Sequence, residues 1–209
     1  MPQKPYHHGD LKNALIKAGI DILATDGIDG LSLRKTAQKA GVSHAAPYAH
    51  FADKQALVAA IASAGHRRIN ARFTELRDRH PDDPLRQLVE TAWAYAEFGL
   101  EETEHFRVTY SSMVTKERDY PDLVDMIGQN AEILRSLMER CQAAGILIAG
   151  DPELVAVGVW GLVHGFISLV LEGQISHNVT NRYATREMLI ACLSLVTRSP
   201  ISEFNITER

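Results

Sequence analysis

The sequence contains little of what a metal or redox centre requires. Its 209 residues include two cysteines, Cys141 and Cys192, and both lie within apolar helical patterns without the spacing of a metal or disulfide motif. His7 and His8 stand next to each other near the N-terminus but have no further metal ligands beside them. We therefore expect no metal ion and no cofactor, and we expect both thiols to be reduced core residues of a cytoplasmic protein.

The sequence also lacks the features of a secreted or membrane-spanning protein. The N-terminal residues have no apolar core of the kind that a signal peptide needs. The longest apolar run, 155–171, is interrupted by His164 and three glycines, and it is shorter than the roughly 20 residues that a membrane span needs. We therefore expect no membrane association.

Positive charge is scarce, since the formal net charge is −4, which excludes a general polyanion binder. The charge is unevenly placed, however. The first 55 residues carry seven Lys and Arg against five Asp, which gives 7 − 5 = +2, and the remainder carries 15 basic and 21 acidic residues, which gives 15 − 21 = −6. A mildly basic end on an acidic body fits a small nucleic-acid footprint.

The most informative pattern is a pair of short helical segments joined by a glycine. Ser32 precedes one run of helix formers and Ser43 precedes the next, so each serine can cap exposed backbone N–H groups. Gly41 stands where a left-handed residue would end the first helix. We expect helices over 33–40 and about 44–50, with Pro47 loosening the start of the second. This outline is typical of a helix-turn-helix DNA reader whose recognition segment is about 43–50.

Lys54 begins the next helical pattern. It follows Asp53, the expected cap of that helix, so a cation stands where the helix dipole disfavours one. A bound phosphate would reverse this penalty, because helix N-terminal N–H groups and a lysine both bind anions. The alternative is an ordinary solvated lysine.

The run from Leu33 to Leu57, with Gly41-Val42-Ser43, Tyr48, His50-Phe51 and Lys54, resembles the DNA-binding domain of the tetracycline-repressor (TetR) family. The resemblance implies a homodimeric, ligand-responsive transcription regulator, usually a repressor, that binds near-palindromic double-stranded DNA. It also implies base and phosphate contacts by Tyr48 and His50 and a phosphate clamp by Lys54. Ala49 departs from the family pattern, which favours a larger residue there. The candidate DNA-binding residues are Ser32, Arg34, Lys35, Ser43, His44, Ala45, Ala46, Tyr48, His50 and Lys54.

Helical periodicity continues along the chain, and no strand pattern or repeat interrupts it. The expected helices lie at 10–27, 33–40, 44–50, 54–79, 84–99, about 105–113, 121–145, 154–173 and 184–197. The long helix at 54–79 would link two domains. The sequence therefore predicts an all-α protein of about nine helices, with a DNA-binding domain at 9–69 and a ligand-binding and dimerisation domain at 81–198.

The helix expected over 154–173 is apolar almost all the way round, so we expect it to be covered on two sides. One stripe of small residues lies about 120° from a second stripe formed by Trp160, His164, Ile167 and Leu171. Two helices from each subunit would form a four-helix dimer interface. The candidate interface residues are Gly158, Gly161, Gly165, Ser168, Leu189 and Leu193. The run 159–166 also resembles the WHG-type C-terminal domain of one TetR subfamily.

Aromatic residues gather on the helices that surround an effector cavity in proteins of the resembling fold. Such walls, with a few polar groups, suit a small, largely apolar effector. The candidate pocket residues are Trp93, Phe98, Phe106, Tyr110, Met113, Trp160 and His164, each of which fits ordinary core packing equally well.

Two other functions stay open at this point. A small hydrolase would need a nucleophile, a base and an orienting group. Cys141 with His105 and Asp125, or Ser111 with His164 and Glu172, supply these residue types, but neither set stands in a recognisable motif. The other alternative is a helical adaptor or ligand-binding protein without operator binding. We expect a regulator and not an enzyme.

Overall fold

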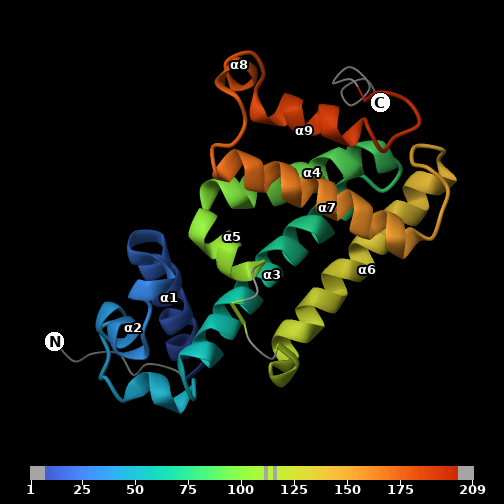
Figure 1. The fold of residues 1–209 in the computed structure, drawn as a ribbon. Coiled ribbons are helices and arrows are strands. Elements are labelled where there is room, and N and C mark those ends of the chain that lie inside the picture. The colour runs from blue at the N-terminus through green and yellow to red at the C-terminus, as the bar shows by residue number, and fades with distance from the viewer. Residues whose placement is uncertain (1–7, 111–112, 115–116, 202–209) are drawn as a thin grey trace. The chain divides into compact units, whose positions relative to one another are not determined.

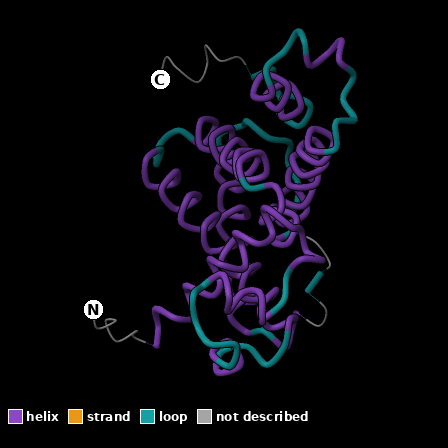
Figure 2. Tube along the Cα trace, turned by 90° about the vertical axis from the view of Figure 1, so that its left-hand side faces the viewer, coloured by secondary structure: helices purple, strands orange, loops and turns teal. Residues whose placement is uncertain are grey.

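The structure, a computed structural model, describes residues 8–110, 113–114 and 117–201. Every regular element in these ranges is helical (Figures 1 and 2), so the prediction of an all-α fold is confirmed. The elements are α1 (His8–Gly30), α2 (Leu33–Lys39), the 3₁₀ helix η1 (Ala46–Ala49), α3 (Lys54–Arg79), α4 (Pro84–Glu101), α5 (Thr103–Thr109), the 3₁₀ helix η2 (Glu117–Asp119), α6 (Pro121–Ala143), α7 (Pro152–Leu171), α8 (His177–Thr180) and α9 (Thr185–Leu193).

The chain divides into two compact units. The head unit holds the residues up to Arg67 together with Glu102–Met126, and the body unit holds Arg68–Glu101 together with the residues from Ile127 onwards. Helices α3 and α6 each run through a boundary between the units. The domains predicted at 9–69 and 81–198 stay predictions, and α5 groups with the head unit.

The head unit is held together by α1, which packs against both α2 and α5. Leu15, Ile22 and Leu23 of α1 are fully buried, because apolar residues recur on one face of this helix. Between α3 and α5, the buried His105 ring lies with Nε2 3.1 Å from the carbonyl oxygen of Ile61 and Nδ1 3.0 Å from a carboxylate oxygen of Glu102. The bond to Ile61 joins α5 to α3, and the bond to Glu102, the capping residue of α5, holds the ring in place.

Helices α4, α7 and α9 of the body unit all pack against one another: α4 on α7, α7 on α9 and α4 on α9. Arg186 of α9 is bonded to Glu90 of α4 at 2.7 Å, and its guanidinium carbon lies 5.3 Å from the centre of the Trp93 ring. A single antiparallel bridge pairs Leu147 with the segment after α9 at Thr197. The cavity described below lies on the other side of α4 and α7, where the second half of α3 and α6 complete the body unit.

Several predicted helix boundaries were wrong. The first helix continues past Gly27 (φ 64°) to Gly30, because glycine adopts positive φ without strain and the helix resumes after the kink. α5 ends at Thr109, so Tyr110 and Met113 lie beyond it. α9 ends at Leu193, where turns lead to the bridge at Thr197. The short α8 was not predicted.

Candidate DNA-binding surface and effector cavity

The turn after α2 has the geometry that its sequence predicts. Ser32 precedes the helix in extended conformation, and its hydroxyl oxygen accepts a hydrogen bond from the Lys35 N–H at 3.2 Å. Gly41 has φ +70°, and the N–H of Val42 donates to the Ala37 carbonyl at 3.0 Å. The bond from Val42 to Ala37 is that of a Schellman motif. Such a motif needs a left-handed residue, and Gly41 adopts this conformation without strain.

The predicted recognition helix is shorter than expected and is a 3₁₀ helix. η1 covers Ala46–Ala49, and its capping position is held by Ala45, which has no side-chain oxygen, so the predicted capping by Ser43 was wrong. The reason is Pro47, which is buried, has no N–H and restricts the residue before it. Within η1, backbone hydrogen bonds join residues three positions apart, as from the Tyr48 N–H to the Ala45 carbonyl at 3.2 Å.

Most of the candidate DNA-binding residues lie at the surface. The exposed ones are Ser32, Arg34, Ser43, His44, Ala45, Tyr48 and Lys54, and the half-buried ones are Lys35, Ala46 and His50. Because α2 packs against η1, these elements form one continuous surface within the head unit. Tyr48 is 62% exposed although its ring is largely apolar, so it has little internal packing.

Two of these side chains, those of Lys35 and Lys54, are engaged within the head. Lys35 pairs with Asp26 at 2.6 Å, and this contact holds the pKa of the Asp26 carboxyl below its usual value. Lys54 Nζ donates to the carbonyl oxygen of Ile28 at 2.8 Å, near the end of α1. Its neighbour Asp53 accepts from the Ala56 N–H at 2.8 Å, so the predicted cap of α3 is confirmed.

His50 is placed differently from the surface residues. Its Nε2 atom is buried and has no hydrogen-bond partner among the described residues. The ring borders a cleft of about 230 Å³ within the head unit, which is also lined by Lys12, Arg67 and Tyr120. This nitrogen does not face solvent, so any contact of His50 with a base or phosphate must use another edge of the ring.

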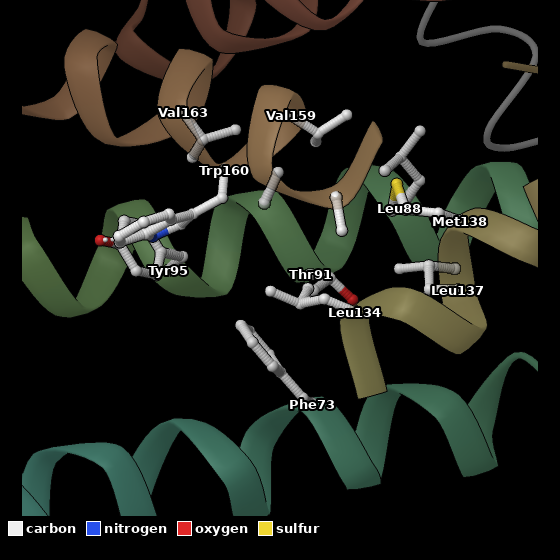
Figure 3. A pocket seen from close by; sticks show the side chains of 12 residues that line it. Phe73, Leu88, Thr91, Tyr95, Leu134, Leu137, Met138, Val159, Trp160 and Val163 are labelled. Carbon is white, nitrogen blue, oxygen red and sulfur yellow. Dashed lines mark hydrogen bonds between the residues drawn. The ribbon is translucent and has the colours of Figure 1, made fainter. Parts of the chain in front are cut away.

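The body unit holds a small apolar cavity of about 30 Å³, shown in Figure 3. It lies between α3, α4, α6 and α7, and no charged side chain lines it. Its volume is that of one water molecule, far below the roughly 300 Å³ or more of a typical ligand pocket. The lining residues are Phe73, Leu88, Thr91, Ala92, Tyr95, Leu134, Leu137, Met138, Ala156, Val159, Trp160 and Val163.

Of the seven candidate pocket residues, Trp160 alone lines this cavity. Trp93 lies under the guanidinium of Arg186, and Phe98 lies under that of Arg68 beside a separate, charged groove. Phe106, Tyr110 and Met113 belong to the head unit, and the ring centres of Phe106 and Tyr110 are 5.0 Å apart. Helical periodicity marks all of them as inward-facing, but it does not show which helices they face.

His164 adjoins the cavity through its neighbours. Its Nδ1 lies 2.7 Å from the hydroxyl oxygen of Tyr95, which also accepts a hydrogen bond from Trp160 Nε1 at 3.2 Å. The indole can only donate, so the Tyr95 hydroxyl accepts this bond, and its own proton is available to His164 Nδ1 when the imidazole proton is on Nε2. Burial lowers the pKa of His164, which keeps this ring neutral.

Sequence reasoning missed Thr91 as a cavity residue. Thr91 lies four positions before Tyr95 on α4, so both side chains share the face that meets α7. A polar residue at the helical spacing of the apolar residues of α4 was the available signal. Phe73 was missed because its place in the cavity depends on how the second half of α3 packs in the body unit.

α7 carries the candidate dimer surface. Gly158, Gly161 and Gly165 are exposed, and a Cβ atom added to any of them would meet nothing within 4 Å. Leu154 and Val157 of the same helix are 72% and 61% exposed. By length and composition, α7 is the one helix of the described residues that is long and apolar enough to cross a membrane. Only 22% of its apolar stretch is buried in the structure. The sequence-based estimate of its apolar length was therefore too short.

Leu189 and Leu193 of α9 were wrong as interface candidates. Both are fully buried within the subunit, where α9 packs on α4 and α7. An amphipathic helix uses its apolar stripe for its own core first, and α9 has one such stripe.

The two enzyme arrangements gain no support from the geometry. Cys141 is buried, burial raises the pKa of its thiol to about 12, and it belongs to the body unit whereas His105 and Asp125 belong to the head unit. A thiol with this pKa is not a nucleophile near neutral pH. Ser111 lies outside the described residues, and His164 Nδ1 is bonded to Tyr95.

Comparison with known proteins identifies the family of both parts of the chain. Residues 15–61 match the family profile of bacterial regulatory proteins of the tetR family, and residues 88–193 match the profile of the tetracyclin repressor-like C-terminal domain. The class A tetracycline repressor protein from transposon 1721 of Escherichia coli is 46% identical over 52 residues, which are 25% of this chain. The matched segment spans 24% of that repressor's length.

Solved structures extend the likeness to nearly the whole chain. A protein of unknown function from Rhodococcus sp. RHA1 is 30% identical with a TM-score of 0.75, covering 90% of this chain and 93% of that one. A putative TetR-family transcriptional regulator from Rhodococcus sp. is 24% identical with a TM-score of 0.68, covering 90% of this chain and 98% of that one. With a C-terminal profile that matches half of its length, this chain belongs to the TetR family of transcriptional regulators.

Proposed function

We propose that the protein is a homodimeric repressor in the cytoplasm, which binds a near-palindromic operator through the surface of α2 and η1. The observation that carries this proposal is the exposed, capped α2–Gly41–η1 arrangement with Tyr48 at the surface, inside the segment that matches the family. The spacing of two such surfaces about 34 Å apart would place them in successive major grooves.

Selection of bound duplexes from a random pool tests the operator. A near-palindromic winner, bound more weakly as salt rises, is the expected result, because phosphate contacts release counterions. The absence of any enriched duplex and of any salt dependence would favour the helical adaptor instead.

Two substitutions test the contact surface. Tyr48→Ala is expected to weaken binding of the selected operator, and Lys54→Ala is expected to weaken it and to lower the salt slope by about one phosphate. The matched control is Arg77→Ala, near the other end of α3, where the guanidinium pairs with Asp78 at 2.9 Å. Because Lys54 also bonds the Ile28 carbonyl, thermal unfolding of each variant separates lost contacts from lost stability. Wild-type affinity in both head variants would reject the assigned contacts.

For the dimer we propose the glycine-bearing face of α7. This face is exposed, apolar and free of neighbours within the subunit, as a surface for close helix approach needs. Gly165→Leu is expected to yield monomers in sedimentation, because a partner helix could no longer approach. Gly128→Leu is the matched control, since Gly128 is also helical and exposed with nothing within 4 Å. A dimer that survives Gly165→Leu would place the interface elsewhere.

For regulation we propose a small, largely apolar effector that binds the cavity of the body unit. Such a ligand releases the operator only if it binds one of two head arrangements more tightly than the other. We infer that α3 and α6 carry the coupling, because each contributes residues to the cavity lining and continues into the head unit. We also infer that the body is of the WHG type, on the strength of Trp160, His164 and Gly165 in α7.

A further inference from the structure

The cavity contains one polar group that is bonded to nothing. Thr91 is 4% exposed, and its Oγ1 atom has no hydrogen-bond partner among the described residues. Other helical threonines of this chain behave differently. Thr36 and Thr109 donate to the carbonyl four residues earlier, at 2.8 Å and 2.7 Å. A buried hydroxyl without a partner is costly, so an unpaired one that lines a cavity is a candidate ligand contact.

No other side chain of the cavity lining is bonded to this hydroxyl. Tyr95 is the other polar residue of α4 in the lining, and its hydroxyl is bonded to Trp160, which Figure 3 also draws, and to His164. A single water would fit the volume, but a buried water is normally held by two to four polar partners, and Thr91 offers one. A helical threonine has two accessible χ1 rotamers, so the hydroxyl can turn towards whatever enters.

The lining also limits the charge of the ligand. It contains no Lys, Arg, Asp or Glu, and the adjoining His164 ring is neutral. An ionised carboxylate or ammonium group brought into such a site would lose its hydration without a counter-charge. A neutral group that accepts or donates one hydrogen bond would lose much less.

We propose that Thr91 is the polar anchor for an uncharged effector that carries one oxygen, such as an alcohol or a ketone, on an apolar body. This inference rests on the proposed effector-responsive function. The apolar part would occupy the space among Phe73, Leu134 and Met138, which must widen from its present 30 Å³. Trp160, 42% exposed, stands between the cavity and the surface.

The test uses three probes of equal chain length: 1-octanol, octanoate and octylammonium. The chain has two tryptophans, so Trp93→Phe leaves Trp160 as the single reporter of the cavity in a fluorescence titration. We expect 1-octanol to bind at least about tenfold more tightly than either ion. We expect Thr91→Val to lower the affinity for 1-octanol by about tenfold, which corresponds to the loss of one hydrogen bond. Thr91→Ser should keep the wild-type affinity because it keeps the hydroxyl.

A stability measurement provides an independent check. Without any probe, Thr91→Val should raise the melting temperature, because it removes an unpaired buried hydroxyl while keeping the shape. Thr36→Val is the matched control and should lower it, because the buried Thr36 hydroxyl is bonded.

Each outcome decides the proposal. Octanoate or octylammonium binding as tightly as 1-octanol, an unchanged affinity in Thr91→Val, or no binding of any probe would each overturn it. Operator binding is measured separately without probe, and Thr91→Val should leave it unchanged. Failure of operator binding would therefore reject the proposed function, whereas failure of the 1-octanol series with intact operator binding would reject the Thr91 anchor alone.

Discussion

Replacing Gly65 by alanine should destabilise the head unit, because Thr109 of α5 lies directly against this glycine of α3. A Cβ atom added to Gly65 would lie 2.0 Å from Oγ1, 2.9 Å from Cγ2 and 3.0 Å from Cβ of Thr109. Rotation about χ1 of Thr109 permutes Oγ1, Cγ2 and the Cβ hydrogen but leaves Cβ in place at 3.0 Å. A rotamer change therefore relieves only part of the contact, and α3 and α5 must still shift slightly apart.

The size of the effect follows from opposing contributions. Overpacking of a buried contact costs about 1–3 kcal/mol, and this site lies at the upper end because backbone must shift. Displacing Thr109 also strains its hydrogen bond to the His105 carbonyl, which contributes about 1 kcal/mol. The greater helix propensity of alanine stabilises the folded state by about 1 kcal/mol. The expected net loss is about 3 kcal/mol, or a melting temperature lower by roughly 6–12 °C.

Thermal unfolding followed by circular dichroism measures this loss. The matched control is Gly128→Ala in α6, where the new methyl group meets nothing within 4 Å and should stabilise by about 1 kcal/mol. The double variant Gly65→Ala with Thr109→Ala should recover part of the loss, because it removes the two nearest atoms. If Gly65→Ala stabilises the protein as much as Gly128→Ala does, the close packing of α5 on α3 is refuted.

Three further predictions concern titration, ion pairing and thiol reactivity. Burial lowers the pKa of His66 from 6.5 to about 4, so the unfolded chain binds one more proton between these values and stability falls as pH drops through this window. His66→Gln should remove up to about 3 kcal/mol of that fall, measured by urea unfolding at pH 7 and pH 4.5. Arg186→Ala should cost about 1 kcal/mol in urea unfolding because this side chain joins α9 to α4, and Arg135→Ala should cost less because its ion pairs lie within α6. In the folded protein, a disulfide reagent should label Cys192, which is half-buried, well before Cys141, and equal rates would contradict the burial of Cys141.

Features that depend on a few neighbouring residues could be predicted from the sequence. The Ser32 cap, the left-handed Gly41 and the Asp53 cap all follow from hydrogen bonds that close within five residues. The same local logic failed at η1, since Pro47 was expected only to loosen the helix and instead changed its type.

Features that depend on packing between distant segments could not be predicted. Leu189 and Leu193 were assigned to a partner subunit because periodicity marks a face as apolar without saying what covers it. The cavity shows the same limit. The aromatic residues pointed to α4, α5 and α7, but the lining comes from α3, α4, α6 and α7, and only the folded arrangement brings Phe73 near Thr91.

α7 links the two proposed sites, because its residues serve both faces. Trp160 lines the cavity and is also 42% exposed on the helix that carries the glycine stripe. If a partner subunit that covers that stripe also reaches the exposed part of Trp160, the indole becomes buried on dimerisation, and its hydrogen bond to the Tyr95 hydroxyl becomes shielded from water. Widening of the cavity by an effector would then have to move a residue of the interface. Effector affinity and dimer affinity are therefore expected to depend on each other through Trp160, by the same factor in both directions.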